Sequence, residues 1–120
     1  MKQTAGRKQL TGVADKFAEL NDDILFGEVW SRTGRLSLKT RCIITVVSLI
    51  AKGITDSSLT YHLTNAKNNG VSLDEMAEII THIAFYVGWP NAWAVLPRLK
   101  EIYGDDDKSK PLFGLGEENK

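Results

Sequence analysis

Apolar side chains recur along this chain at spacings of three and four residues, and no long stretch alternates apolar and polar positions. Apolar residues three and four positions apart are typical of helices with one buried face, whereas alternation of apolar and polar residues would indicate strands. The pattern predicts helices over the following ranges: 11–20, 22–30, 38–52, 57–69, 73–87 and 90–103. We therefore expect an all-α fold, a single-domain bundle of about six helices.

Residues that start and stop helices agree with these ranges. Thr55 and Asp56 are suited to cap one helix, Ser72 with Glu75 forms the S-x-x-E capping box of the next, and Pro90 fits a first helical turn. Glycines follow four of the ranges at intervals of 16 to 18 residues, at Gly53, Gly70, Gly88 and Gly104. A glycine just past a helix end takes the left-handed conformation at little cost, so each predicts a helix stop.

The segment 42–51 (CIITVVSLIA) is apolar nearly all round. Such a helix has to be covered on every side, which favours self-association; the alternative is a helix central to a compact monomer. At ten residues it is too short to cross a bilayer. We expect a helical domain over 1–104, followed over 105–120 by a polar tail, or an arm that orders on a neighbouring subunit.

Composition excludes several classes of function. Fifteen Lys and Arg balance fifteen Asp and Glu, giving a net charge of +0, whereas a nucleic-acid binder needs a basic excess. A single cysteine excludes an intramolecular disulfide and a two-thiol redox couple within one subunit, and it fits a reducing cytoplasm. With no secretory or membrane signal in the chain, we expect a soluble, cytoplasmic protein.

The strongest candidate for acid–base chemistry is His82. Glu75, Glu78, His82 and Tyr86 follow one another at helical spacings and share one face. A carboxylate one turn from an imidazole can fix its tautomer and stabilise its charged form, as a general acid or base requires. The alternative is a solvated pair on a helix surface, but the apolar neighbours over 79–87 predict burial.

Other candidates have plainer alternatives. His62 lies on an apolar stripe, where a histidine is more often a hydrogen-bonded core residue. Arg32, Arg35 and Arg41 lie near the start of the apolar helix. They either bind a small organic acid or serve as surface charges.

Cys42 is expected to be a buried, unreactive thiol. Sequence motifs of zinc proteases, dinucleotide enzymes and NTPases are missing.

Three motifs together resemble the carboxymuconolactone decarboxylase family, which has the alkylhydroperoxidase-like fold. They are LFGEVW at 25–30, H-L-x-x-A-x-x-N-G at 62–70 and ITHxAFYxGWP at 80–90, and the resemblance extends over about 22–103. It implies a helical subunit that associates, commonly as trimers or hexamers, with sites at subunit contacts. It also implies one of two chemistries: cofactor-free decarboxylation of a small lactone acid, or thiol peroxidase (peroxiredoxin-type) activity.

The peroxidase chemistry is disfavoured. When His62 is matched to the histidine of the C-x-x-C-x-x-x-H motif, the two cysteine positions hold Thr55 and Ser58. Neither hydroxyl can reduce a peroxide by the thiol route, and Cys42 has no resolving partner in the subunit.

The decarboxylase interpretation requires a cation for the carboxylate, a dry pocket and a proton donor. The expected catalytic residues are His82, oriented by Glu78, and His62. The expected substrate-binding residues are Arg41, Arg35, Trp30, Tyr86 and Trp89. The expected ligand is a small lactone or carboxylic acid, with no metal or organic cofactor.

One position departs from the family. Related decarboxylases carry Y-C-G-x-P where this chain has Val87 in place of the cysteine. The resemblance therefore does not identify the substrate of this chain. A non-enzymatic alternative keeps the fold as a small-molecule-binding or assembly protein.

Overall fold

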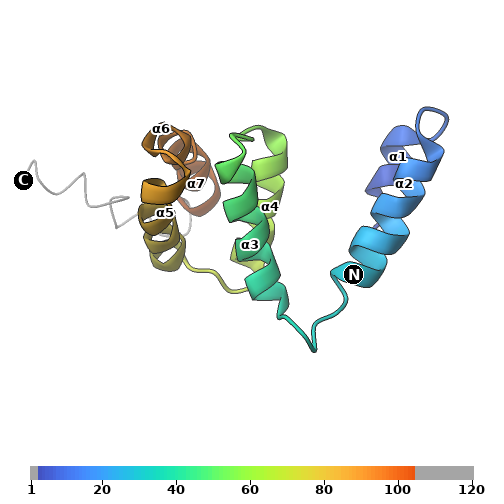
Figure 1. The fold of residues 1–120 in the computed structure, drawn as a ribbon, viewed down its shortest axis with the longest axis horizontal. Helices are drawn as coiled ribbons and strands as arrows, with labels where there is room; N and C mark the ends of the chain where they lie inside the picture. Colours follow the sequence, from blue (N-terminus) through green and yellow to red (C-terminus); the bar gives the residue numbers. More distant parts are fainter. Residues whose placement is uncertain (1–2, 105–120) are drawn as a thin grey trace, which may run out of the picture. The chain divides into compact units, whose positions relative to one another are not determined.

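The computed structural model describes residues 3–104, and these residues form helices joined by short loops, with no β-strand among them (Figure 1). In chain order the elements are α1 (Ala5–Leu10), α2 (Asp15–Glu19), η1 (Leu20–Val29), α3 (Leu38–Ala51), α4 (Ser57–Asn68), α5 (Leu73–Val87), α6 (Trp89–Trp93) and α7 (Leu96–Tyr103). The predicted all-α class is confirmed. The predicted tail over 105–120 lies outside the described residues.

The chain divides into two compact units, Met1–Arg41 and Cys42–Lys120, and each is described by itself. In the first unit, α2 continues without a break into η1, a π-helix. The prediction of two separate helices, with Asp22 at the start of the second, is therefore wrong. The short helix α1 was not predicted, because Ala5 and Leu10 are the only apolar side chains among its six residues.

Asp22 instead caps α1 through space. Its carboxylate is buried and accepts hydrogen bonds from the backbone N–H groups of Gly6 (2.9 Å) and Arg7 (3.0 Å) and from Asn21 Nδ2 (3.0 Å). Burial by itself would raise the pKa of Asp22, but these hydrogen bonds outweigh it and the pKa is lowered. A Cβ atom at Gly6 would lie 2.8 Å from the carboxylate, so the close approach requires glycine.

The second unit is built on α3, α4 and α5. One stripe of α3 is buried, formed by Cys42, Val46 and Ile50, whereas Ile44 on another side of the helix is 48% exposed. Asn69 Nδ2, just past α4, lies 3.9 Å from Cys42 Sγ, and the two helices run side by side (Figure 1). Within one chain, α3 is thus covered only in part.

The predicted helix starts of this unit are confirmed. Asp56 accepts a hydrogen bond from the Ser58 N–H (2.9 Å) at the start of α4, and Ser72 Oγ accepts one from the Glu75 N–H (3.1 Å) at the start of α5. The predicted left-handed stops are confirmed at positions 53, 70 and 88, where φ is 75°, 97° and 104°. α7 ends at Tyr103 with Gly104 as its C-cap, as predicted, but Gly104 does not take the left-handed conformation, because its φ is −58°.

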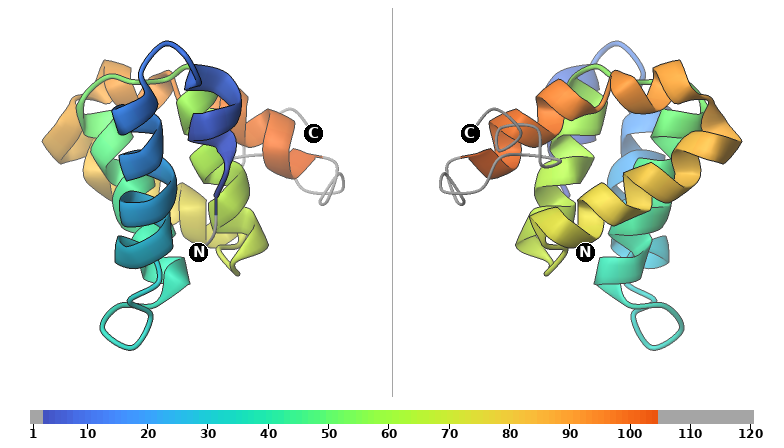
Figure 2. Two further views of the ribbon diagram at one scale, coloured as in Figure 1. Left: turned by 90° about the vertical axis from the view of Figure 1, so that its right-hand side faces the viewer. Right: turned by 90° about the vertical axis from the view of Figure 1, so that its left-hand side faces the viewer.

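The helix predicted over 90–103 is divided into α6 and α7. Pro97 stands in the first turn of α7, where its missing N–H breaks no helical hydrogen bond, and the chain bends just before it. The bend lets α7 pack against α4, while α6 follows α5 across Gly88 (Figure 2). Tyr103 Oη donates a hydrogen bond to the carbonyl of Val71 (2.7 Å), which fixes the end of α7.

Candidate active site

A groove of about 430 Å³ runs between α3 and α5 in the second unit. Its lining consists of Ile43 and Val47 from α3 and Glu75, Glu78, Ile79, His82 and Ile83 from α5. Two carboxylates and one imidazole therefore lie over an otherwise aliphatic floor.

The helical repeat of α5 explains this arrangement. Met76, Ile80, Ile83 and Ala84 are buried and form the core-facing stripe of the helix. His82 lies on a different face from that stripe and is exposed. The burial expected for His82 is therefore not found in the single chain, because the apolar neighbours in its sequence point mainly to the core.

The imidazole of His82 is oriented by an aromatic contact. Its ring stacks on that of Tyr86, with centroids 5.4 Å apart and planes inclined by 29°. Among residues 3–104 no ion pair or hydrogen bond joins Glu78 to His82, although both line the groove. Glu78 and His82 therefore share the groove without a direct polar contact.

His62 is placed elsewhere. Its ring is half-buried on α4 and meets that of Tyr61 edge-on, with centroids 5.0 Å apart. Burial lowers the pKa of His62, which favours the neutral ring at neutral pH. His62 is not among the residues that line the groove, so the structure does not bring the two histidines together there.

The remaining predicted substrate-binding residues of the N-terminal part belong to the first unit. Arg41 is committed to the loop before α3: its Nε donates to the carbonyl of Leu36 (3.1 Å) and its Nη2 to that of Arg32 (2.8 Å). Arg35 is exposed. Trp30 is 6% exposed, and its ring stacks on Phe26 with centroids 5.7 Å apart.

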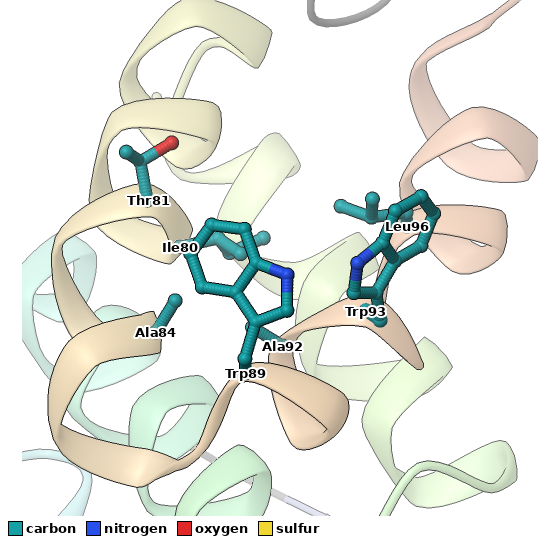
Figure 3. Close-up of a pocket in the computed structure, with 7 residues that line it drawn as sticks. All are labelled: Ile80, Thr81, Ala84, Trp89, Ala92, Trp93 and Leu96. Atoms are coloured by element: carbon teal, nitrogen blue, oxygen red, sulfur yellow. The ribbon is translucent and has the colours of Figure 1, made fainter.

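A second hollow lies between α5 and α6, with a volume of about 250 Å³ (Figure 3). It is lined by Ile80, Thr81, Ala84, Trp89, Ala92, Trp93 and Leu96. Trp89, predicted to contact substrate, therefore opens into this pocket and not into the groove of His82. Phe85 holds the Trp89 ring edge-on, with centroids 5.6 Å apart.

Sequence reasoning missed how Glu75 serves the site. Its spacing from His82 placed it on the same face, but it is not among the residues expected to be catalytic. Its backbone N–H donates to Ser72, and its side chain lines the groove. Ile43 and Val47 carried no signal, because contacts between separate helices are not encoded locally.

Two further findings concern metal ions and membranes. Residues 3–104 contain no group of three or more His, Cys, Asp or Glu side chains placed to hold a metal ion. None of the helices in the same range is both long and apolar enough to cross a bilayer.

The second unit thus combines an all-helical fold with a groove that holds one imidazole and two carboxylates over aliphatic side chains. The chain belongs to the carboxymuconolactone decarboxylase family, whose model matches residues 15–101. It is 34% identical over 110 residues to a 4-carboxymuconolactone decarboxylase of Acinetobacter baylyi, an alignment that covers 86% of this chain and 81% of the relative. No solved structure gives a significant match. The resemblance inferred from the sequence motifs is thereby confirmed.

Proposed function

We propose that the chain is a carboxy-lyase that removes carbon dioxide from a small lactone acid without a cofactor. Membership of the family and the named relative support decarboxylase chemistry. The observation that carries the proposal is the groove between α3 and α5, where His82 and Glu78 lie over aliphatic side chains.

The groove suits the needs of this reaction. Breaking the bond between the ring carbon and the carboxylate leaves its electron pair on carbon, delocalised into the lactone carbonyl, and a proton must then be delivered to that carbon. His82 is the proposed donor and recovers its proton from water. Glu78 is the proposed positioning residue, because it lines the same groove one helical turn before His82.

The substrate carboxylate needs a cation, and no Lys or Arg side chain lines the groove. Arg35 and Arg41, predicted from the sequence, are the proposed candidates. Arg35 is the better of the two, since Arg41 already donates to two backbone carbonyls. Tyr86, which stacks on His82, stays a candidate for a contact to the apolar part of the substrate. His62, Trp89 and Trp30 were also predicted to contact substrate, but none of them lines the groove.

Replacing the proton donor tests the proposal. We expect His82→Gln to lower kcat for a lactone acid by about 10²- to 10⁴-fold, the usual contribution of a general acid, with an unchanged circular dichroism spectrum. Glu78→Gln should lower kcat less and shift its pH profile, whereas the matched change Asp74→Asn on the same helix should alter neither. Full activity of His82→Gln would refute the assignment.

The peroxidase alternative is not favoured by the structure. Cys42 is 1% exposed, and burial raises the pKa of its thiol, so little reactive thiolate is present at neutral pH. A non-enzymatic binding role remains the other candidate. It predicts that lactone acids bind but are not turned over.

We also propose that the protein self-associates, as a trimer or hexamer. Large apolar side chains are exposed on α5 of the single chain, with Phe85 at 76% and Tyr86 at 80%, next to a partly covered α3. A second copy on this surface would exclude water from His82. Sedimentation equilibrium tests the assembly; a monomer at high protein concentration would refute it.

The cytoplasmic location inferred from the single cysteine can be tested by cell fractionation.

A further inference from the structure

The pocket between α5 and α6 has a chemistry that differs from that of the groove. Apart from Thr81 and the two tryptophans, its lining is aliphatic, and none of its side chains carries a charge. Thr81 donates its hydroxyl proton to the carbonyl of Ala77 (2.8 Å), so it has no proton left for a ligand. The only hydrogen-bond donors that the lining side chains can offer are thus the indole N–H groups of Trp89 and Trp93.

These two donors are turned toward the same space. In Figure 3 the nitrogen-bearing edges of Trp89 and Trp93 face one another across the pocket. Neither indole N–H has a hydrogen-bond acceptor among the residues that the structure describes. Both rings are half-exposed, at 54% and 55%, so a ligand can reach them.

We propose that this pocket is a binding site for an uncharged, single-ring molecule that carries one carbonyl acceptor. Its volume of about 250 Å³ exceeds the ~150 Å³ cavity that encloses benzene and is smaller than the ~300 Å³ lower limit of common drug-sized sites. The aliphatic floor and the indole rings would cover the ring of the ligand, and the paired donors would hold its carbonyl oxygen.

The absence of charge in the lining decides against an anion. An ionised carboxylate would lose its hydration with no cation in the lining to replace it, which is costly in apolar surroundings. The site is therefore distinct in ligand class from the groove of His82, and it does not rest on the proposed decarboxylase function.

Acetophenone is a suitable probe, because it is neutral and combines one ring with one carbonyl. The chain has three tryptophans, and their indole N–H signals can be followed in ¹H–¹⁵N spectra of the full-length protein. We expect acetophenone to shift the signals of Trp89 and Trp93 in a saturable way and to leave that of Trp30 unchanged. Trp30 belongs to the first unit and serves as the internal control.

Two comparisons isolate the donors. Ethylbenzene, which has the same shape without the acceptor, should bind about 2- to 12-fold more weakly, the range expected for a hydrogen bond of ordinary net strength. Trp93→Phe and Trp89→Phe should each weaken acetophenone binding within the same range and leave ethylbenzene binding unchanged. Benzoate should bind more weakly than acetophenone.

Several outcomes would overturn the proposal. They are no saturable shift at either tryptophan, an equal shift at Trp30, or benzoate binding as tight as that of acetophenone. Equal affinity for acetophenone and ethylbenzene would reduce the site to an apolar hollow. Because the wild-type spectra carry the main test, a variant that fails to fold leaves it intact.

Discussion

A matched pair of truncations on α3 tests how much of this apolar helix the single chain buries. Ile50 is 0% exposed and Ile44 is 48% exposed, and both lie on the same helix. Truncation to alanine removes the same Cγ and Cδ carbons at both sites, so the difference between the two variants reports burial alone.

The magnitudes follow from the exposures. At roughly 0.8 kcal/mol per buried carbon, the full transfer free energy lost is about 2.4 kcal/mol. Ile50→Ala also leaves a cavity, which adds about 1 kcal/mol, and regains up to about 0.4 kcal/mol of helix propensity, so the expected loss is about 3 kcal/mol, within the usual range of about 2–5 kcal/mol. Ile44→Ala loses about half of the transfer free energy and regains up to about 0.4 kcal/mol of helix propensity, a net loss of about 0.8 kcal/mol.

Urea unfolding followed by far-UV circular dichroism measures both losses, and it should be run at low and high protein concentration. A loss below about 1 kcal/mol for Ile50→Ala would refute its place in the core. Equal losses for the two variants in a dilute, monomeric sample would refute the partial covering of α3. If the loss for Ile44→Ala grows with protein concentration, a second copy covers this side of the helix.

Three further predictions concern single positions. Gly88→Ala should lower the free energy of unfolding in urea by roughly 1–3 kcal/mol, because φ is 104° at this position. Gly104→Ala should cause no measurable loss, because φ there is −58° and the space around it is open. Equal losses for the two variants would contradict this argument from backbone conformation. Because burial lowers the pKa of His62, the unfolded chain binds more protons than the folded chain below about pH 6.5. The free energy of unfolding should therefore fall on acidification from about pH 7.5 to about pH 5.5. It should fall less in the variant His62→Gln, and an identical fall in that variant would exclude this cause. Cys42 should react slowly with a thiol reagent in the native protein and rapidly in urea, because burial raises its pKa and blocks access; rapid native reaction would contradict its burial.

The parts of the fold that local chemistry determines were predictable from the sequence. Asp56 and Ser72 cap the helices that they were expected to cap, because a cap and its N–H partner lie two or three residues apart. The carboxylate of Asp22 could not be placed in this way. It caps a helix whose N–H groups lie 15 and 16 residues earlier, and no local pattern records such a pair.

The site was predictable only as a face of a helix. The spacing of Glu75, Glu78 and His82 correctly put them on one side of α5, and all three line one groove. Whether that side is covered depends on which helices pack against it, and here the apolar neighbours of His82 were misleading. The division of the predicted helix over 90–103 follows from Pro97, a local signal that was overlooked.

The attachment of α7 has a consequence for the order in which the chain folds. Among residues 3–104, hydrogen bonds that fasten this helix run from Arg98 Nε to the Thr55 carbonyl (3.3 Å), from Lys67 Nζ to the Ile102 carbonyl (2.9 Å) and from Tyr103 Oη to the Val71 carbonyl (2.7 Å). Their partners are 43, 35 and 32 residues apart, so each closes a long loop whose entropy must be lost first. We therefore expect α7 to dock late in folding, since a chain emerging from the ribosome cannot complete this unit until its residue 103 is free.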